Sequence, residues 1–292
     1  MTNERSLRAR LARVVPVTVV LAVLLVSWYG AALPMNSSLP SFPPGGTLAE
    51  RFLAAWSLER PVLPAPHQIV AALWNATVDT PVSSPRSLVF HGAITLSSTL
   101  LGFALGAALG MALAIGIVHV RALEKSLMPW LVASQTIPIL AIAPIVVVAL
   151  GAAGITGLIP KALISMYLSF FPVAIGMVKG LTSPEPMLLD LTRTYSASRT
   201  QVLMRLRLPA AVPFLFASLK VAVAISLVGA IVGELPTGST LGLGARLLSG
   251  SYYGQTVQIW AALTAAAILA AVLVQLVALA ERLTARVMGA RP

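Results

Sequence analysis

Six long runs of apolar residues dominate the chain, and shorter polar or basic stretches separate them. An α-helix rises about 1.5 Å per residue, so about 20 consecutive apolar residues cross the hydrocarbon layer of a bilayer. The pattern therefore predicts an all-α membrane protein with about six transmembrane helices. The runs cover approximately residues 14–33, 94–119, 129–150, 158–178, 212–232 and 257–280.

Two of these runs have unusual features. The first follows several arginines, as a cleaved signal peptide would, but its length exceeds the usual apolar stretch of about 7–15 residues, which favours an uncleaved helix. The third run contains three prolines and the polar residues Ser134, Gln135 and Thr136. Membrane helices tolerate proline where neighbouring helices satisfy the freed carbonyl groups. We therefore expect residues 129–150 to form one kinked helix inside the bundle.

The distribution of lysine and arginine predicts the orientation of the helices, because cytoplasmic segments carry an excess of both. With the N-terminus in the cytoplasm, most of these residues fall inside, namely Arg5, Arg8, Arg10, Arg13, Arg121, Lys125, Lys179, Arg193, Arg199, Arg205, Arg207, Arg282, Arg286 and Arg291. Those that fall outside are Arg51, Arg60, Arg86 and Arg246. We therefore expect both termini to be cytoplasmic (N-in/C-in).

Composition agrees with lipid as the surrounding medium. The 292-residue chain is 58% hydrophobic and 10% charged, with a mean hydropathy of +0.90, whereas a typical soluble domain is about 25% charged. The net charge of +11 does not indicate nucleic-acid binding, because the basic residues lie between apolar runs and form no continuous stripe.

Residues suited to catalysis or metal binding are scarce. The chain has no cysteine, which excludes disulfides, thiolate metal sites and a cysteine nucleophile. His67, His91 and His119 are far apart, so neither a metal site nor histidine-based catalysis is expected. The phosphate-binding motif Gly-x-x-x-x-Gly-Lys-Ser/Thr does not occur in the sequence. We therefore expect a protein that is not an enzyme.

The first connection, at about residues 34–93, is long and rich in proline and serine. Its first part favours extended or turning chain, and two short amphipathic pieces follow at residues 48–58 and 67–77. Trp56 and Trp74 on these pieces are typical of a membrane interface. The segment is either a surface cap or a docking surface for a soluble partner, and the sequence leaves both interpretations open.

A second long connection, at about residues 180–213, predicts two short helices. Ser183 is placed to cap a helix that begins with Pro184, because proline fits the first helical turn. That helix should end near Thr194, and a bend should follow at residues 195–197.

Ser198 and Gln201 form a capping box, which predicts a second helix that Pro209 ends. The two helices leave apolar side chains without cover, namely Leu188, Leu191, Val202 and Leu206. An apolar patch rimmed by charge is typical of a partner-binding site.

This connection resembles the cytoplasmic coupling loop, or EAA loop, of binding-protein-dependent ABC importer permeases. The pattern is Glu-Ala-Ala, three residues, Gly, about nine residues, an apolar residue, one more residue, then Leu-Pro. Here Asp-Leu-Thr at residues 190–192 replaces Glu-Ala-Ala, and Ser196 replaces the glycine, which costs about 1 kcal/mol if the bend needs a positive φ. The resemblance implies ATPase coupling through Asp190, Arg193, Thr194, Ser196, Ala197, Ser198, Arg199, Leu203, Leu206 and Pro209.

The similarity extends beyond the loop. Leu-Pro-Ala-Pro at residues 63–66, Gln-Thr-Ile-Pro at 135–138, Ala-Pro at 143–144 and Gly-Glu at 233–234 resemble permeases for sulfonates, taurine, nitrate and pyrimidine precursors. The likeness spans about residues 63–286. It divides the chain into residues 1–62, with the first helix and the external segment, and a permease core at residues 63–292.

The resemblance implies a type I ABC importer permease fold in a bacterial inner membrane. The implied partners are ATPase subunits, a periplasmic substrate-binding protein and a second permease subunit; a homodimer is expected, and a heterodimer stays open. ATP and Mg²⁺ are expected on the ATPase, with no cofactor on this chain. Two alternatives are an ion-gradient-driven secondary transporter or channel, which predicts inverted repeats, and a membrane scaffold that anchors partners.

Several positions inside the apolar runs remain as candidates. Ser134, Gln135, Thr136 and Glu234 are possible lining residues of a translocation path, since polar groups in a membrane face the protein interior. For Glu234 a simple helix end in water is the preferred interpretation.

Small residues recur on the second run, where Gly102, Gly106 and Gly110 are four residues apart and predict close helix packing. The region that contains residues 242–244 and 251–254, together with residues 135–138, resembles pyrimidine- or riboflavin-type members more than taurine members. The sequence does not exclude sulfonate or nitrate as the substrate.

Overall fold

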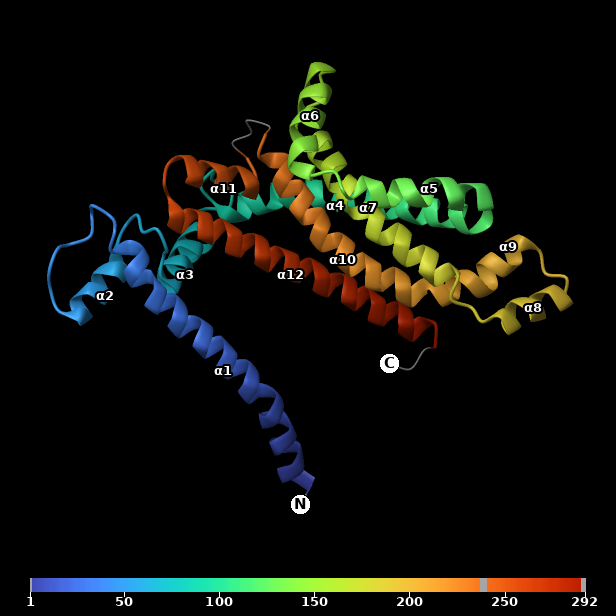
Figure 1. Cartoon of the computed structure of the whole chain (residues 1–292), viewed down its shortest axis with the longest axis horizontal. Coiled ribbons are helices and arrows are strands. Elements are labelled where there is room, and N and C mark those ends of the chain that lie inside the picture. The colour runs from blue at the N-terminus through green and yellow to red at the C-terminus, as the bar shows by residue number, and fades with distance from the viewer. Residues whose placement is uncertain (1, 237–240, 290–292) are drawn as a thin grey trace. The chain divides into compact units, whose positions relative to one another are not determined.

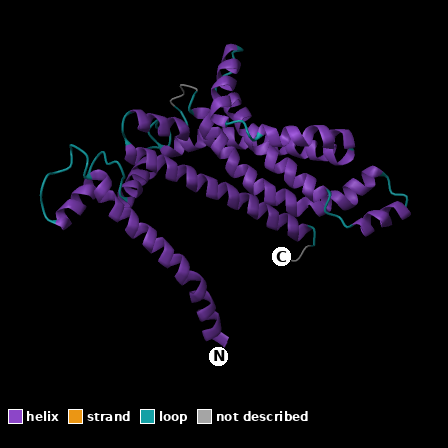
Figure 2. Ribbon diagram, in the orientation of Figure 1, coloured by secondary structure: helices purple, strands orange, loops and turns teal. Residues whose placement is uncertain are grey.

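The computed structural model describes residues 2–236 and 241–289, with side chains from Val15 onward. This part of the chain consists of helices and loops without a strand (Figures 1 and 2). The α-helices are α1 (Thr2–Asn36), α2 (Leu48–Ser57), α3 (Pro66–Trp74), α4 (Leu88–His119), α5 (Arg121–Ser134), α6 (Ile139–Ala152), α7 (Leu158–Leu181), α8 (Pro186–Thr194), α9 (Arg199–Val202), α10 (Leu208–Glu234), α11 (Leu243–Tyr252) and α12 (Thr256–Val287). Two π-helical segments, η1 (Asn75–Asp79) and η2 (Leu203–Arg207), follow α3 and α9.

Five stretches are long and apolar enough to cross a membrane: Val15–Asn36 of α1, α4, α7, Arg199–Glu234 and α12. Five of the six predicted apolar runs lie within these helices, so the all-α membrane class is confirmed. The positions used to predict the orientation are only partly covered, because Arg291 and the side chains of Arg5, Arg8, Arg10 and Arg13 lie outside what the structure describes.

The chain forms two compact units. Unit 1 comprises residues 1–81 and 247–264, and unit 2 comprises residues 82–246 and 265–292, so α11 and α12 contribute to both. In unit 1 the buried amide of Asn36 donates to the carbonyls of Ala55 and Leu63, each at 3.0 Å. Its oxygen accepts the N–H groups of Val62 and Leu63 at 2.8 and 3.0 Å. One side chain thus fastens the end of α2 and the chain before α3 to the end of α1.

The centre of unit 2 is a three-helix core of α4, α7 and α10. Small residues let α4 approach α7 closely: a methyl group added at Gly102 would lie 2.6 Å from the carbonyl oxygen of Ala162, and one added at Gly110 would lie 2.6 Å from that of Phe170. An added Cβ at Gly106 would likewise collide with Ser169. The strip of glycines is therefore a packing surface.

Buried hydroxyl groups join the three core helices. Ser165 of α7 and Ser226 of α10 have their Oγ atoms 2.6 Å apart. Ser226 Oγ also donates to the carbonyl of Thr99 in α4 at 2.9 Å. All three residues are fully buried, and because each hydroxyl has a partner, the seam adds rigidity without leaving an unsatisfied polar group.

The glycine contacts fix the directions of the core helices. α4 and α7 run parallel, because Gly102 adjoins Ser165 and Gly110, later in α4, adjoins Phe170. α10 runs the opposite way, since its last turn adjoins Lys161 near the start of α7. A chain that crosses twice in the same direction must return in between, so α5 and α6 together count as one candidate span, which brings the candidate spans among the described residues to six.

The third apolar run does not form the expected single kinked helix; that prediction was wrong. α5 and α6 are separate helices bent by 97°. The break occurs at Pro138, which is the N-cap of α6 with φ −66° and ψ 121°, because proline disfavours a helical conformation at the residue before it. Pro129 and Pro144 lie inside α5 and α6 and do not interrupt them.

The expected position of this run inside the bundle is also wrong for the single chain. Leu131 is the buried residue of α5 and Ala143 that of α6. Large apolar side chains on the same pair are mostly exposed, for example Ile145 at 68% and Val148 at 70%. The described part of the chain therefore leaves this crossing at the surface of unit 2.

Candidate functional site

Residues between α7 and α10 form two short helices at one end of unit 2, which we call the arm (residues 186–207; α8, α9 and η2) (Figure 1). α8 begins at Pro186 after the N-cap Glu185, and it ends at Thr194 as predicted. The predicted cap at Ser183 is wrong. Its hydroxyl instead donates to the carbonyl of Gly180 at 2.8 Å, where it satisfies the end of α7.

Ser196 turns the chain between α8 and α9. Its φ is +50°, the positive value expected at this bend. The N–H of Ser196 bonds to the carbonyl of Arg193 at 2.9 Å, and that of Ala197 bonds to Thr192 at 3.0 Å. This pair of bonds is a Schellman motif, which usually places glycine at the position of Ser196. The replacement of the usual glycine is therefore accommodated, at a conformational cost.

The predicted capping box of α9 is confirmed. The N–H of Ser198 bonds to Gln201 Oε1 at 2.8 Å, and the N–H of Gln201 bonds to Ser198 Oγ at 3.3 Å. The prediction that Pro209 ends this helix is wrong, because the helical path continues from Arg199 to Glu234. Pro209 lies in the first turn of α10. The π turn of η2 shifts the hydrogen-bond register just before it, which accommodates the N–H that proline lacks.

The outer face of the arm exposes large apolar side chains. Met187 and Tyr195 are 78% and 79% exposed, and Met204 is 58% exposed. None of these three residues was predicted from the sequence to be an exposed apolar contact. Leu188 and Leu191 are also exposed, as expected.

Three other apolar side chains of the arm lie differently. Leu203 packs against the apolar core of unit 2, and Val202 and Leu206 are half-buried. Met187, Leu188, Leu191, Tyr195 and Met204 thus form what we call the outer face of the arm.

A groove of about 470 Å³ lies between the arm and the end of α4. Residues from both elements line it, including Val118, His119, Thr192, Arg193, Arg199 and Arg207. Arg207 also donates to the carbonyl of Leu181 at 3.1 Å, which ties the base of the arm to α7. The groove is therefore basic and adjoins the apolar outer face.

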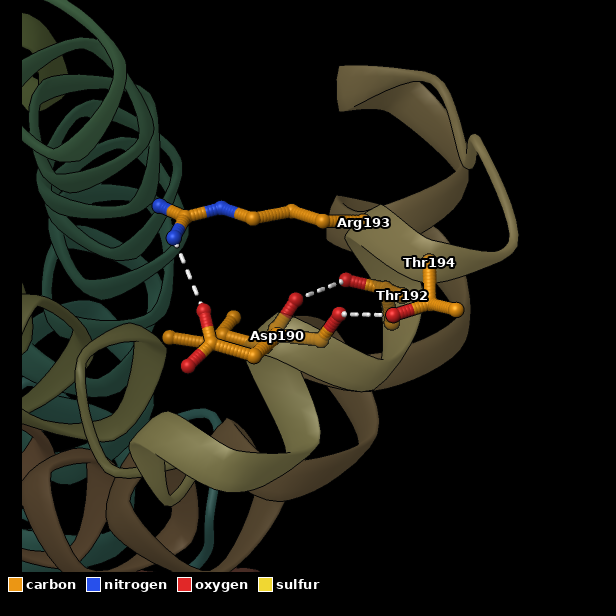
Figure 3. Close-up of polar contacts among 5 residues, drawn as sticks. Asp190, Thr192, Arg193 and Thr194 are labelled. Atoms are coloured by element: carbon orange, nitrogen blue, oxygen red, sulfur yellow. Dashed lines mark hydrogen bonds and ion pairs between the residues drawn. The ribbon is translucent and has the colours of Figure 1, made fainter.

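Asp190 and Arg193 form an exposed ion pair of 2.8 Å on α8. Figure 3 shows Arg193 extending back to Asp190, while the hydroxyls of Thr192 and Thr194 bond within the helix. Both charged side chains are largely in water, 66% and 81% exposed, so the pair contributes little to stability. Both groups remain available to a partner.

The possible path residues do not form one site. Ser134, Gln135 and Thr136 lie at the break between α5 and α6, where the side-chain hydrogen bonds of the three are local. Glu234 lies at the other end of α10 from the arm, and its described hydrogen bonds go to Thr95 and to the N–H of Gly244. The interpretation of Glu234 as a helix end in water is wrong, because the residue is fully buried.

Sequence reasoning missed the residues around Glu234. His91, Thr95 and Lys161 come from α4 and α7 and are all buried. Only Lys161 gave a signal in the sequence, as one of the few charges within an apolar run. Among the described residues, no group of three or more His, Asp or Glu side chains could hold a metal ion.

Comparison with known proteins agrees with this architecture. Residues 88–289 match the family described as binding-protein-dependent transport system inner membrane component. The riboflavin transport system permease protein RibX of Chloroflexus aurantiacus is 36% identical over 225 residues, which cover 77% of this chain and 80% of that protein.

Two other relatives differ in their named substrates. The formylaminopyrimidine transport permease protein ThiX of Halalkalibacterium halodurans is 35% identical over 184 residues, 63% of this chain and 68% of that protein. A Bacillus subtilis permease protein named for aliphatic sulfonates is 28% identical over 221 residues, 76% of each chain. The proteins of this family are transport permease subunits and not enzymes. The chain belongs to the family of binding-protein-dependent transport system inner membrane components, and it is a multi-pass inner-membrane permease subunit of an ABC transporter.

Proposed function

We propose that the arm is the surface through which an ATPase subunit drives this permease. The observation that carries the proposal is the outer face of the arm, where Met187 and Tyr195 are more than three-quarters exposed. Large apolar side chains on a water-facing projection are costly unless a partner covers them. Arg193 and Arg199, which line the groove on the same arm, add positive charge, and charged residues around an apolar surface are typical of a protein–protein interface.

The connection between the arm and the core suits mechanical coupling. The helical path from Arg199 to Glu234 is 36 residues long, or about 54 Å at 1.5 Å per residue. Leu203 and Arg207 fasten the base of the arm to the core and to α7. A force on the arm would therefore move α10 as a unit, since packed helices switch between discrete arrangements and do not deform smoothly.

The charge distribution supports a cytoplasmic arm. Cations gather at the arm end of unit 2, at Arg121, Lys125, Lys179, Arg193, Arg199, Arg205, Arg207, Arg282 and Arg286. Arg86 and Arg246 belong to the opposite end. With the arm inside and six crossings, both termini lie in the cytoplasm.

The relatives support the rest of the assembly and the class of substrate. We propose that a periplasmic binding protein delivers the solute, that a second copy of this permease completes the path, and that ATP and Mg²⁺ bind the ATPase partner. The relatives named for riboflavin and formylaminopyrimidine are 36% and 35% identical, against 28% for the one named for sulfonates. A small heterocycle is therefore the proposed substrate.

Co-purification tests the proposal. The tagged chain is purified from detergent-solubilised membranes of its own bacterium, and the partners are assayed for ATP hydrolysis. We expect a stoichiometric ATPase with the wild-type chain. We expect the amount of co-purified ATPase to fall about tenfold or more, relative to the wild-type chain, in the double variant Met187→Ser/Tyr195→Ser and in the single variant Arg199→Glu. Such a loss is typical when central interface residues are removed.

Arg121→Glu is the matched control, because Arg121 is an exposed arginine at the same end of unit 2 but outside the arm. It should retain the ATPase. Equal retention in all variants would contradict a docking role for the arm. A chain that purifies alone and transports on an ion gradient would favour the secondary-transporter alternative.

A further inference from the structure

The start of α11 is held by side chains from two other helices. Three consecutive backbone N–H groups each bond to a different side chain: Gly242 to His91 Nδ1 at 2.9 Å, Leu243 to Thr95 Oγ1 at 2.9 Å, and Gly244 to Glu234 Oε2 at 2.8 Å. His91 and Thr95 belong to α4, and Glu234 is the last residue of α10. The first N–H groups of a helix have no partner within the helix, so these side chains cap α11 from outside its own sequence.

The capping side chains are themselves joined. Thr95 Oγ1 donates to Glu234 Oε1 at 2.8 Å. Since His91 Nδ1 accepts from Gly242, the ring proton lies on Nε2, which donates to the carbonyl of Pro85 at 2.9 Å. On the α7 side, Lys161 Nζ donates to the carbonyl of Leu241 at 3.4 Å, and its positive charge acts on Glu234.

This network is buried. Glu234 and Thr95 are 0% exposed, His91 is 1% exposed and Lys161 is 5% exposed. Burying ionisable groups is costly unless they are hydrogen-bonded or paired, and here each of these side chains has a partner. A polar network in which the groups are satisfied fixes one arrangement of the elements that it joins.

Two glycines make the close approach possible. Gly242 has φ +118°, and a Cβ at this position would collide with the carboxyl group of Glu234. A Cβ at Gly244 would lie 2.9 Å from Glu234 Cβ. The Gly-Leu-Gly sequence at residues 242–244 thus has a steric role in this chain, independent of any resemblance.

We propose that His91, Thr95 and Glu234 are positioning residues, a latch that fixes the start of α11 to the end of the core opposite the arm. The latch stays closed throughout the transport cycle, so that α4, α7, α10 and the first turn of α11 move as one body. A movement of the arm then also moves the start of α11 at the far end of the core, because the latch holds the end of α10 and the start of α11 together. The source of that movement rests on the proposed function, whereas the latch itself does not.

Hydrogen–deuterium exchange tests the latch in the purified full-length permease without its partners. The peptide that contains residues 241–246 should exchange slowly in the wild-type protein. Thr95→Val keeps the shape of the side chain but removes its donor and its acceptor. It should speed exchange in this peptide about tenfold or more, as expected for two lost hydrogen bonds, with exchange in α8 unchanged.

Matched variants separate positioning from general damage. Thr95→Ser retains the hydroxyl and should restore slow exchange, and Ser97→Ala, at an exposed position of the same helix, should match the wild type. If Thr95→Val does not accumulate, Glu234→Leu, which removes both acceptor oxygens, replaces it with the same expectation. Slow exchange at residues 241–246 in the substituted protein would overturn the latch.

The rigid-body part of the proposal needs the assembled complex. The same peptide should stay protected both without nucleotide and after trapping with ATP and vanadate. Fast exchange in the trapped complex would overturn it, because the latch would then open during the cycle. If no ATPase co-purifies, the proposed function fails, while the experiment on the permease alone still decides whether the latch exists.

Discussion

The core of unit 2 and the arm follow opposite rules of construction. In the core, Ser165 and Ser226 are fully buried and bonded, and an added methyl group on Gly110 would collide with α7. On the arm, Met187 and Tyr195 are more than three-quarters exposed. In the core, small residues allow the helices of the chain to pack closely. On the arm, large apolar residues are exposed and available for contact with another protein. The difference fits the proposed division of roles, in which the arm receives a movement from the ATPase and the core transmits it.

The largest loss of stability should come from disrupting the close packing of α4 against α7 in the core. Gly110→Ala places a methyl group 2.6 Å from the carbonyl oxygen of Phe170, where the backbone cannot move aside. We expect a loss of about 3 kcal/mol of stability, measured as a lower melting temperature in detergent. Gly92→Ala, in the same helix but with no atom within 4 Å of the added carbon, should not lower it. Equal melting of both variants would contradict the close packing.

A smaller loss of stability is expected from breaking the ion pair between α10 and α12. Lys220 and Glu281 form an ion pair, and their side chains are 32% and 30% exposed. Lys220→Met or Glu281→Gln alone leaves one charge unpaired in an apolar region and should cost about 1–2 kcal/mol, while the double change should recover part of the loss. Melting temperatures of the four proteins give the coupling energy. If the losses of stability in the two single variants add up in the double variant, the ion pair does not contribute to stability.

Single substitutions should change the stability of the arm in both directions. Ser196→Gly removes the strain of φ +50° at the bend and should stabilise the end of α8 by about 0.5–1 kcal/mol. Ser198→Ala removes the cap of α9 and should destabilise it by about 1 kcal/mol. Hydrogen exchange in peptides of the arm measures both. Shifts of the same sign would rule out this account of the bend.

The smallest effect is expected at the exposed ion pair of α8. Asp190→Asn should change the stability of the protein by less than about 0.5 kcal/mol, because exposed pairs are screened by water and salt. The melting temperature checks this directly. A loss comparable to that of Gly110→Ala would mean that the arm is part of the structural core, which would remove the contrast between the two regions.

Sequence reasoning succeeded where a local rule decides the structure. The apolar runs gave the long helices, and the spacing of Ser198 and Gln201 gave the capping box of α9. The end of α8 and its bend also follow from local chemistry. The same rules failed where one residue fits two local structures. Ser183 is compatible with the end of α7 and with the start of α8, and Pro209 is compatible with the end of one helix and with the first turn of the next.

Contacts between distant segments were beyond a local reading. The pairing of Glu234 with Thr95 spans 139 residues, and no periodicity reports it. The break at Pro138 also needed the structure, because Pro129 and Pro144 carry the same signal and leave their helices intact. The resemblance implied a coupling role for Leu203, and only the fold shows that this side chain packs against the core.

The proposed function requires the arm and α10 to move as one body. Since the chain has no cysteine, spin labels can be placed at Thr200→Cys on the exposed side of α9 and at Val221→Cys, which is 50% exposed on α10. Labelled chain is diluted with unlabelled chain, and the distance between the labels is measured in the ATPase complex by pulsed electron paramagnetic resonance. We expect one narrow distribution of distances that is the same without nucleotide and after trapping with ATP and vanadate. A distribution that shifts or broadens on trapping would contradict it, because the arm would then bend independently of the helix that it is proposed to drive.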